Sequence, residues 1–96
     1  MVEAEQELVD AVLWYESKQP GLGRRFRKEV EAVVHSIAQN PLLNRERDGG
    51  YRRVNCPVFP YYLPYFIRRD KIIVAAVAHE HRKPSYWNQR QSNHHA

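Results

Sequence analysis

Two apolar stripes with helical spacing constrain the fold of this chain more than any other feature. The first stripe consists of Ala4, Leu8, Ala11, Val12 and Tyr15. The second repeats the same offsets with Phe26, Val30, Val33, Val34 and Ile37. Such spacing puts the apolar side chains on one face of a helix. The sequence therefore predicts two amphipathic helices, the first over about residues 3–19.

The ends of both helices are marked by residues that interrupt helical structure. Pro20-Gly21 ends the first helix, and Asn40-Pro41 ends the second, because the residue before a proline is pushed out of the α region. The short linker Pro20-Gly21-Leu22-Gly23 predicts an α-hairpin with one apolar side. Glu3, Glu5 and Glu7 are interpreted as acids of the first helical turns, where they interact favourably with the helix dipole.

Beyond Pro41 the pattern becomes strand-like. A polar loop over residues 41–50 ends in Asp48-Gly49-Gly50, and strands are predicted over residues 51–56, 61–68 and 72–78. Arg69-Asp70-Lys71 forms the turn between the last two strands. Pro64 lies inside the second strand, where it removes a hydrogen-bond donor, so this strand needs either a bulge or an edge position.

These elements predict an α+β fold. A two-helix hairpin packs on one face of a small antiparallel sheet of three to four strands, because each layer needs an apolar partner. The other sheet face is expected to carry Arg and Tyr side chains and to stay open to solvent. The 96 residues suffice for one domain, expected over residues 1–90, with a polar, disordered tail over residues 91–96.

The charge of the chain is unevenly distributed. Residues 1–44 carry five Lys/Arg and seven Asp/Glu, a net of −2, whereas residues 45–96 carry ten Lys/Arg and four Asp/Glu, a net of +6. A basic half of this kind attracts nucleic acid or an acidic protein segment. A merely solvated basic surface is the alternative interpretation.

The composition also argues against several classes of protein. The longest uncharged apolar run, residues 72–78, is too short to span a membrane, and the N-terminus lacks the pattern of a signal peptide. Cys56 is the only cysteine, so it can form neither an internal disulfide nor a metal site by itself. We therefore expect a cytoplasmic protein with no membrane association, metal or cofactor.

Several short motifs together resemble the RelE/ParE superfamily of type II toxins, also labelled plasmid stabilisation proteins. In chain order they are Trp14-Tyr15-Glu16, Pro20-Gly21-Leu22-Gly23-Arg24-Arg25-Phe26, Tyr51-Arg52-Arg53-Val54, Phe59-Pro60-Tyr61, Ala76-Val77-Ala78-His79, and Arg82, Pro84, Tyr86, Trp87 and Arg90. Members of this superfamily usually begin with a short strand, and the sequence here predicts no strand before the first helix. We expect either that the start is truncated or that the domain folds with fewer strands. A missing strand would expose an edge of the sheet.

The resemblance implies the toxin of a bacterial toxin–antitoxin system that arrests growth. A cognate antitoxin would wrap and neutralise it, giving a homo- or hetero-oligomer, and would be acidic over the basic sheet face. In the ParE-like branch the toxin binds DNA gyrase and is not an enzyme. In the RelE-like branch it is an endoribonuclease that cleaves mRNA on the ribosome. The motif Trp14-Tyr15-Glu16 favours the ParE-like branch. A degenerate, non-toxic relative that acts only as an interaction module is the alternative.

Ribonuclease chemistry would need an acid–base group and permanent cations beside the phosphate. The candidate catalytic residues are His79, Arg82, Arg53, Arg52 and Tyr86. His79 can give or take a proton near neutral pH, but it could equally be a structural histidine held by hydrogen bonds. Strand alternation puts Arg52 and Arg53 on opposite faces, and spacing does not decide which one faces solvent.

A binding surface would use an overlapping set of residues. The candidates for contact with nucleic acid or a partner protein are Arg52, Arg53, Arg82, Trp87 and Arg90. Trp87 could stack on a base, but packing of the C-terminal turn onto the sheet is the favoured interpretation of this residue.

Overall fold

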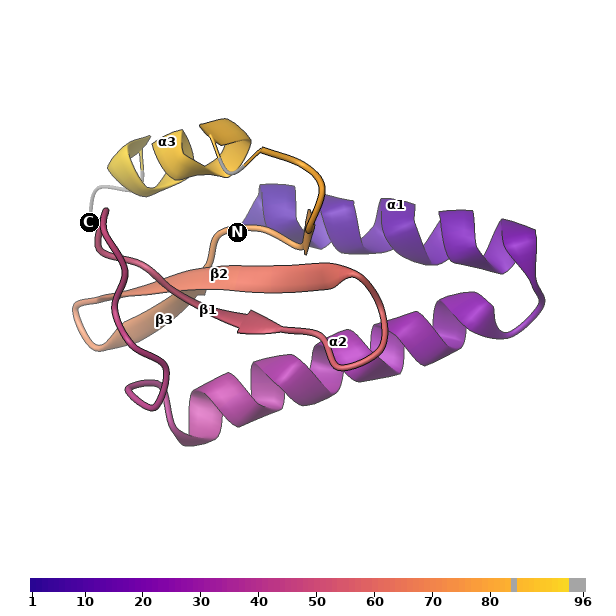
Figure 1. Cartoon of the computed structure of the whole chain (residues 1–96), viewed down its shortest axis with the longest axis horizontal. Helices are drawn as coiled ribbons and strands as arrows, with labels where there is room; N and C mark the ends of the chain where they lie inside the picture. Colours follow the sequence, from indigo (N-terminus) through magenta and orange to yellow (C-terminus); the bar gives the residue numbers. More distant parts are fainter. Residues whose placement is uncertain (84, 94–96) are drawn as a thin grey trace.

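Both predicted helices are present and pack on the same face of an antiparallel sheet (Figure 1). The computed structural model describes residues 1–83 and 85–93. Helix α1 spans Val2–Lys18 and helix α2 spans Leu22–Gln39, close to the predicted bounds. Nine of the ten stripe residues are buried or half-buried; Val34 is the exception, with 40% of its surface exposed. The apolar face of α2 is therefore narrower than its sequence pattern indicates.

The linker between the helices is fixed by Glu16. Its carboxylate accepts hydrogen bonds from the backbone N–H groups of Gly21 (2.8 Å) and Gly23 (3.1 Å), at the start of α2. Such bonds satisfy donors that a helix N-terminus leaves unpaired. A Cβ on Gly23 would lie 2.4 Å from the Val12 carbonyl oxygen, so only glycine allows the two helices to approach this closely.

Within the described residues the sheet contains four strands, which agrees with the predicted antiparallel sheet of three to four strands. They are β1 (Arg52–Asn55), β2 (Tyr61–Arg68), β3 (Lys71–Val74) and β4 (Ala78–His79). All pairings are antiparallel: β2 is central, β1 lies on one side of it, and β3 and β4 lie on the other. A two-residue turn with positive φ at Arg69 and Asp70 connects β2 to β3.

Pro64 lies opposite a bulge that interrupts the predicted strand over residues 72–78. Tyr65 pairs with Val74 and Tyr62 pairs with Ala78, so the three residues 75–77 face only the two residues 63–64. One extra residue on one strand defines a β-bulge. Of the two predicted solutions for Pro64, the bulge is confirmed. The edge position is wrong, because β2 is the central strand.

Different helices pack on the two faces of the sheet. Tyr61, Leu63 and Tyr65 of β2 pack with α1 and α2, whereas Tyr62 and Phe66 pack with Trp87 of a third helix, α3 (Ser85–Asn93). The expectation that the second face stays open to solvent is therefore wrong: α3 covers part of it. The predicted tail over residues 91–96 overlaps the end of α3, and residues 94–96 lie outside the described residues.

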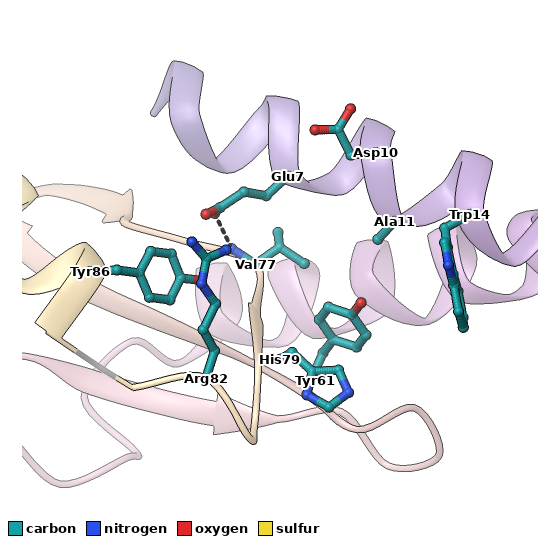
Figure 2. A pocket seen from close by; sticks show the side chains of 9 residues that line it. All are labelled: Glu7, Asp10, Ala11, Trp14, Tyr61, Val77, His79, Arg82 and Tyr86. Atoms are coloured by element: carbon teal, nitrogen blue, oxygen red, sulfur yellow. Dashed lines mark hydrogen bonds between the residues drawn. The ribbon is translucent and has the colours of Figure 1, made fainter.

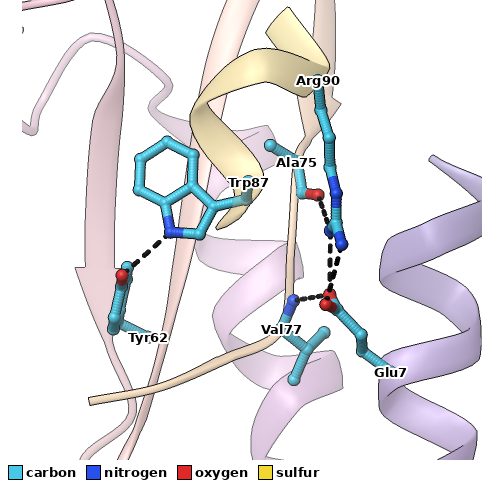
Figure 3. Close-up of polar contacts among 6 residues, drawn as sticks. All are labelled: Glu7, Tyr62, Ala75, Val77, Trp87 and Arg90. Atoms are coloured by element: carbon cyan, nitrogen blue, oxygen red, sulfur yellow. Dashed lines mark hydrogen bonds and ion pairs between the residues drawn. The ribbon is translucent and has the colours of Figure 1, made fainter. Parts of the chain in front are cut away.

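An ion pair joins both helical layers to the bulge (Figure 3). The Arg90 guanidinium donates to both carboxylate oxygens of Glu7, at 3.1 Å each, and to the Ala75 carbonyl oxygen at 2.8 Å. Glu7 also accepts a 3.0 Å hydrogen bond from the Val77 N–H. Both charged side chains are more than four-fifths buried. They thus satisfy backbone groups that the bulge removes from the β2 ladder.

Glu7→Ala should therefore destabilise the fold. The change leaves the Arg90 charge and the Val77 N–H without their partner in a mostly buried place, and we expect a loss of about 2 kcal/mol in the free energy of unfolding. The measurement is urea-induced unfolding, followed by circular dichroism.

Glu31→Ala is the matched control, because it removes a glutamate from an exposed pair with Arg27. Its effect should stay within about 0.5 kcal/mol. Equal losses for the two variants would contradict the role assigned to Glu7.

Candidate functional site

A pocket of about 270 Å³ lies between α1, the end of β4 and the segment that leads into α3 (Figure 2). We call it the His79 pocket. Its lining residues are Glu7, Asp10, Ala11, Trp14, Tyr61, Val77, His79, Arg82 and Tyr86. Three of the predicted catalytic candidates, His79, Arg82 and Tyr86, meet here although they come from different elements.

The His79 ring is oriented by its own backbone neighbourhood. Its Nδ1 atom accepts a 3.2 Å hydrogen bond from the His81 N–H, which places the proton of the neutral ring on Nε2. The ring packs edge-to-face on Tyr61, with the centroids 5.1 Å apart. His79 is thus held by hydrogen bonding, as one interpretation of the sequence expects, and still presents an Nε2 donor at the pocket wall.

Two guanidinium groups lie close to the Tyr86 ring. The central carbon of Arg82 is 3.9 Å from the centre of the Tyr86 ring, and that of Arg90 is 5.2 Å away. Burial, and secondarily the negative charge of Glu7, raises the pKa of Tyr86 to about 12, although both arginines act in the opposite direction. The phenol therefore stays neutral at physiological pH and can donate a hydrogen bond, but it is no base there.

The charges around the His79 pocket are mixed. Glu7 is neutralised by its pairing with Arg90, which leaves Asp10 and Arg82 on different walls. The Asp10 side chain lies on α1 and accepts a 2.9 Å hydrogen bond from Gln6 of the same helix. A phosphate in this pocket would meet the charge of a single arginine, so the pocket has little attraction for an anion.

Arg52 and Arg53 do not join this pocket, because β1 and β4 lie on opposite sides of β2. As predicted from alternation, they face different sides of the sheet. Arg52 pairs with Tyr65 on the face covered by α1 and α2, and donates to the Asn44 carbonyl oxygen. The Arg53 guanidinium lies on the other face, 3.7 Å from the centre of the Tyr62 ring. The structure thus assigns each arginine to a face, which spacing leaves open, and both residues are half-buried.

The last two binding candidates have structural contacts. Trp87 is buried, with 1% of its surface exposed, and its Nε1 donates a 2.9 Å hydrogen bond to the Tyr62 hydroxyl (Figure 3). Packing on the sheet, the favoured interpretation of Trp87, is confirmed. Arg90 is engaged by Glu7 and by the bulge.

The α1 residues of the pocket were not identified from the sequence as site residues. Glu7, interpreted there as an acid of the helix dipole, stands three residues after Ala4 and four before Ala11, both of which are buried. This spacing places a carboxylate beside the buried stripe and is the signal that could have revealed it. Asp10 and Trp14 follow at intervals of three and four, so they extend the same side of the helix.

Other kinds of site are not evident. Within residues 1–83 and 85–93, no cluster of three or more His, Cys, Asp or Glu side chains could hold a metal ion. No helix in these ranges is both long and apolar enough to cross a lipid bilayer. Cys56 is buried, and burial raises the pKa of its thiol to about 11, so it is a poor nucleophile.

A family model described as the ParE toxin of the type II toxin–antitoxin system, parDE, matches residues 1–84. No curated protein and no solved structure matches the chain.

The raised pKa of Tyr86 predicts a pH dependence of stability. In the unfolded chain this phenol ionises near pH 10, but in the folded chain only near pH 12, so between these values the unfolded state binds fewer protons. The free energy of unfolding should therefore fall as the pH rises through this window. It should fall less in Tyr86→Phe than in the wild type, as urea unfolding at a series of pH values would measure.

Burial also raises the pKa values of Tyr15 and Tyr61. Both residues are present in the wild type and in Tyr86→Phe, so their contributions cancel when the slopes of unfolding free energy against pH are compared. Identical slopes for the wild type and the variant would show that Tyr86 ionises as an ordinary exposed phenol.

Proposed function

Because the chain belongs to the ParE toxin family of type II toxin–antitoxin systems, we propose that it arrests growth by binding DNA gyrase and is not itself an enzyme. Membership of this family makes the chain a toxin and implies an antitoxin as its partner. The identity of the target is our inference. Gyrase lies in the bacterial cytoplasm, and we propose that the toxin acts there.

The charge of the His79 pocket carries this proposal. Cleavage of RNA passes through a transition state with extra negative charge on the phosphate, which an enzyme stabilises with several cations. Here Arg82 is the one arginine among the residues that line the pocket, while Arg52 and Arg53 lie elsewhere on the sheet. Tyr86 stays neutral and is no base at physiological pH. These features suit a protein-binding surface better than a ribonuclease site.

Ribosome-dependent mRNA cleavage is the second candidate. The meeting of His79, Arg82 and Tyr86 in one pocket favours it, because together they offer an acid–base group, a cation and a hydrogen-bond donor. The two candidates differ in what they require of His79. A ribonuclease needs its proton transfer, whereas a gyrase inhibitor needs only the shape of the surface.

The test is inducible expression in a bacterium, with DNA supercoiling and translation followed in the same culture. We expect an early loss of negative supercoiling while translation continues. His79→Asn should stay toxic, because the asparagine side-chain oxygen can replace Nδ1 as the acceptor for the His81 N–H, while the titratable ring is lost.

A ribonuclease would give the opposite results. Translation would stop first with cleaved messages, and His79→Asn would lower the cleavage rate by about 10²–10⁴-fold. Arg82→Ala would also abolish toxicity in that case. Folded protein without effect on either process would instead indicate a non-toxic relative that acts only as an interaction module.

The basic end of the sheet is the surface that we propose for the antitoxin. Seven basic residues lie on the loop after α2, on β1 and around the β2–β3 turn: Arg45, Arg47, Arg52, Arg53, Arg68, Arg69 and Lys71. These segments gather at one end of the sheet (Figure 1). An acidic antitoxin segment would be attracted to this end, and its binding would give a toxin–antitoxin hetero-oligomer.

Arg53→Gln should weaken the complex with the cognate antitoxin about tenfold at low salt, because one charge is removed from the proposed interface. The difference between variant and wild type should shrink as salt is added. Arg27→Gln, which removes an exposed charge from α2, is the matched control and should leave the affinity unchanged. Equal affinities for all three proteins across the salt range would exclude the basic end of the sheet from the interface.

A further inference from the structure

The outer side of β3 is an open edge of the sheet. Within the described residues β3 pairs only with β2, so no strand lies on its other side. The Val74 carbonyl oxygen points to this open side, where it accepts a 3.3 Å hydrogen bond from the N-terminal ammonium of Met1. The next residue, Ala75, points its N–H the other way and donates to Pro64. Because successive residues of a strand alternate in this respect, Ile72 and Val74 both direct their backbone groups to the open side.

An apolar groove of about 410 Å³ adjoins this edge. Ile72 and Val74 line it from the sheet, and Val30 and Val34 line it from α2. Val34 is the stripe residue of α2 that stays exposed, with 40% of its surface accessible. The apolar face of the helical layer is therefore left partly uncovered at this place. Apolar surface beside outward-pointing backbone groups is the combination to which a further strand can add. We call the open side of β3 with its groove the β3 edge.

The two edges of the sheet differ in charge. At the opposite edge, β1 carries Arg52 and Arg53 and lies within the basic end of the sheet. Two copies of the chain that met there would bring like charges together, which protects this edge from pairing. In β3 the only charged side chain is Lys71 at its first position, and the following residues, Ile72, Ile73 and Val74, are apolar. The β3 edge thus lacks the charges that keep an edge strand from pairing with its own copy.

We propose that two copies of this chain associate through their β3 edges, with the two β3 strands antiparallel about a two-fold axis at Ile73. In this register Ile72 of each copy lies opposite Val74 of the other, and these two residues exchange backbone hydrogen bonds on either side of the axis. The Ile72 N–H of the second copy takes the place of Met1 as donor to the Val74 oxygen. Only Met1, which precedes the first residue of α1, has to move.

The side chains suit this register on both faces of the sheet. Ile72 and Val74 face α1 and α2, so each cross-strand pair adds a β-branched contact beside the groove and near Val34. Ile73 faces α3 and meets its own copy at the axis. The Lys71 residues of the two copies lie about 14 Å apart along the strands, beyond the screening length at physiological salt. An extended segment of a foreign protein could add to the same edge, but this self-complementary register favours a second copy.

The first test is the oligomeric state of the full-length protein, measured by sedimentation velocity over a range of concentrations. The paired strands are short and the interface is small, so we expect a reversible dimer with a dissociation constant on the order of 10–100 µM. Hydrogen exchange of the wild type locates the contact. The amides of Ile72 and Val74 should gain protection as the concentration rises, whereas the amide of Ile73, which points to β2, should not change.

Two valine-to-lysine variants test the groove. Val34→Lys puts a charge at the groove and should weaken the dimer about tenfold. Val9→Lys is the matched control, because Val9 is also an exposed helical valine, with 50% of its surface accessible, but does not line the groove. It should leave the dissociation constant unchanged. Circular dichroism checks that both variants are folded.

Two cysteine variants test the register. In Ile73→Cys the two cysteines face each other at the axis with their Cα atoms about 4.5 Å apart, within the reach of a disulfide. In Lys71→Cys they are about 14 Å apart along the strands, which is too far. In a glutathione redox buffer only the first variant should form a covalent dimer. The natural Cys56 is buried and should not compete.

The proposal is overturned if the wild type stays monomeric over the whole concentration range. Equal effects of Val34→Lys and Val9→Lys, or equal cross-linking of the two cysteine variants, would also overturn it by placing the contact elsewhere. Protection of the Ile72 and Val74 amides that appears only when an antitoxin is added would overturn it too and assign the β3 edge to an antitoxin strand. All these measurements use the isolated protein, so their results are independent of whether gyrase proves to be the target.

Discussion

The ion pair between Glu7 and Arg90 holds the parts of this molecule together. A bulge in the strand formed by β3 and β4 takes backbone groups out of the ladder, and these groups lie where water is largely excluded. Glu7 of α1 accepts from the Val77 N–H, and Arg90 of α3 donates to the Ala75 carbonyl. The pair therefore ties α1 and α3 to one short segment of the sheet. Neither charge would be stable there alone, because a mostly buried charge needs a partner.

The bulge also decides which side of the sheet His79 faces. Val74 lies opposite Tyr65, on the face covered by α1 and α2. With strict alternation from Val74, His79 would face the other side, towards α3. The extra residue shifts the register by one, so His79 lies opposite Tyr61 and on the same face. Pro64, which cannot donate to a ladder, faces this interruption, and the Ala75 N–H donates to its carbonyl oxygen. The His79 pocket is thus a consequence of the bulge.

The protein presents two surfaces of opposite character. The loop after α2, β1 and the β2–β3 turn form a basic end, whereas α1 contributes acids and exposed aromatic surface around the His79 pocket. Under the proposed function, an antitoxin covers the basic end, and the toxin recognises a different macromolecule when the antitoxin is gone. Two surfaces of opposite charge would distinguish these partners electrostatically, because the basic end repels a basic partner and the acids of α1 repel an acidic one.

The sequence by itself determined both helices, the central strand, the β2–β3 turn, the fold class and the resemblance to the toxin superfamily. These features depend on the spacing of apolar residues and on residues such as Pro20 and Pro41, which act locally. Only the tertiary structure decided the central position of β2, the α3 cover over Trp87, the face occupied by Arg53, and the grouping of Asp10 and Trp14 with His79. These depend on which segments distant in the sequence lie together. A one-residue bulge, which periodicity cannot locate, reverses the faces of every later residue in the strand.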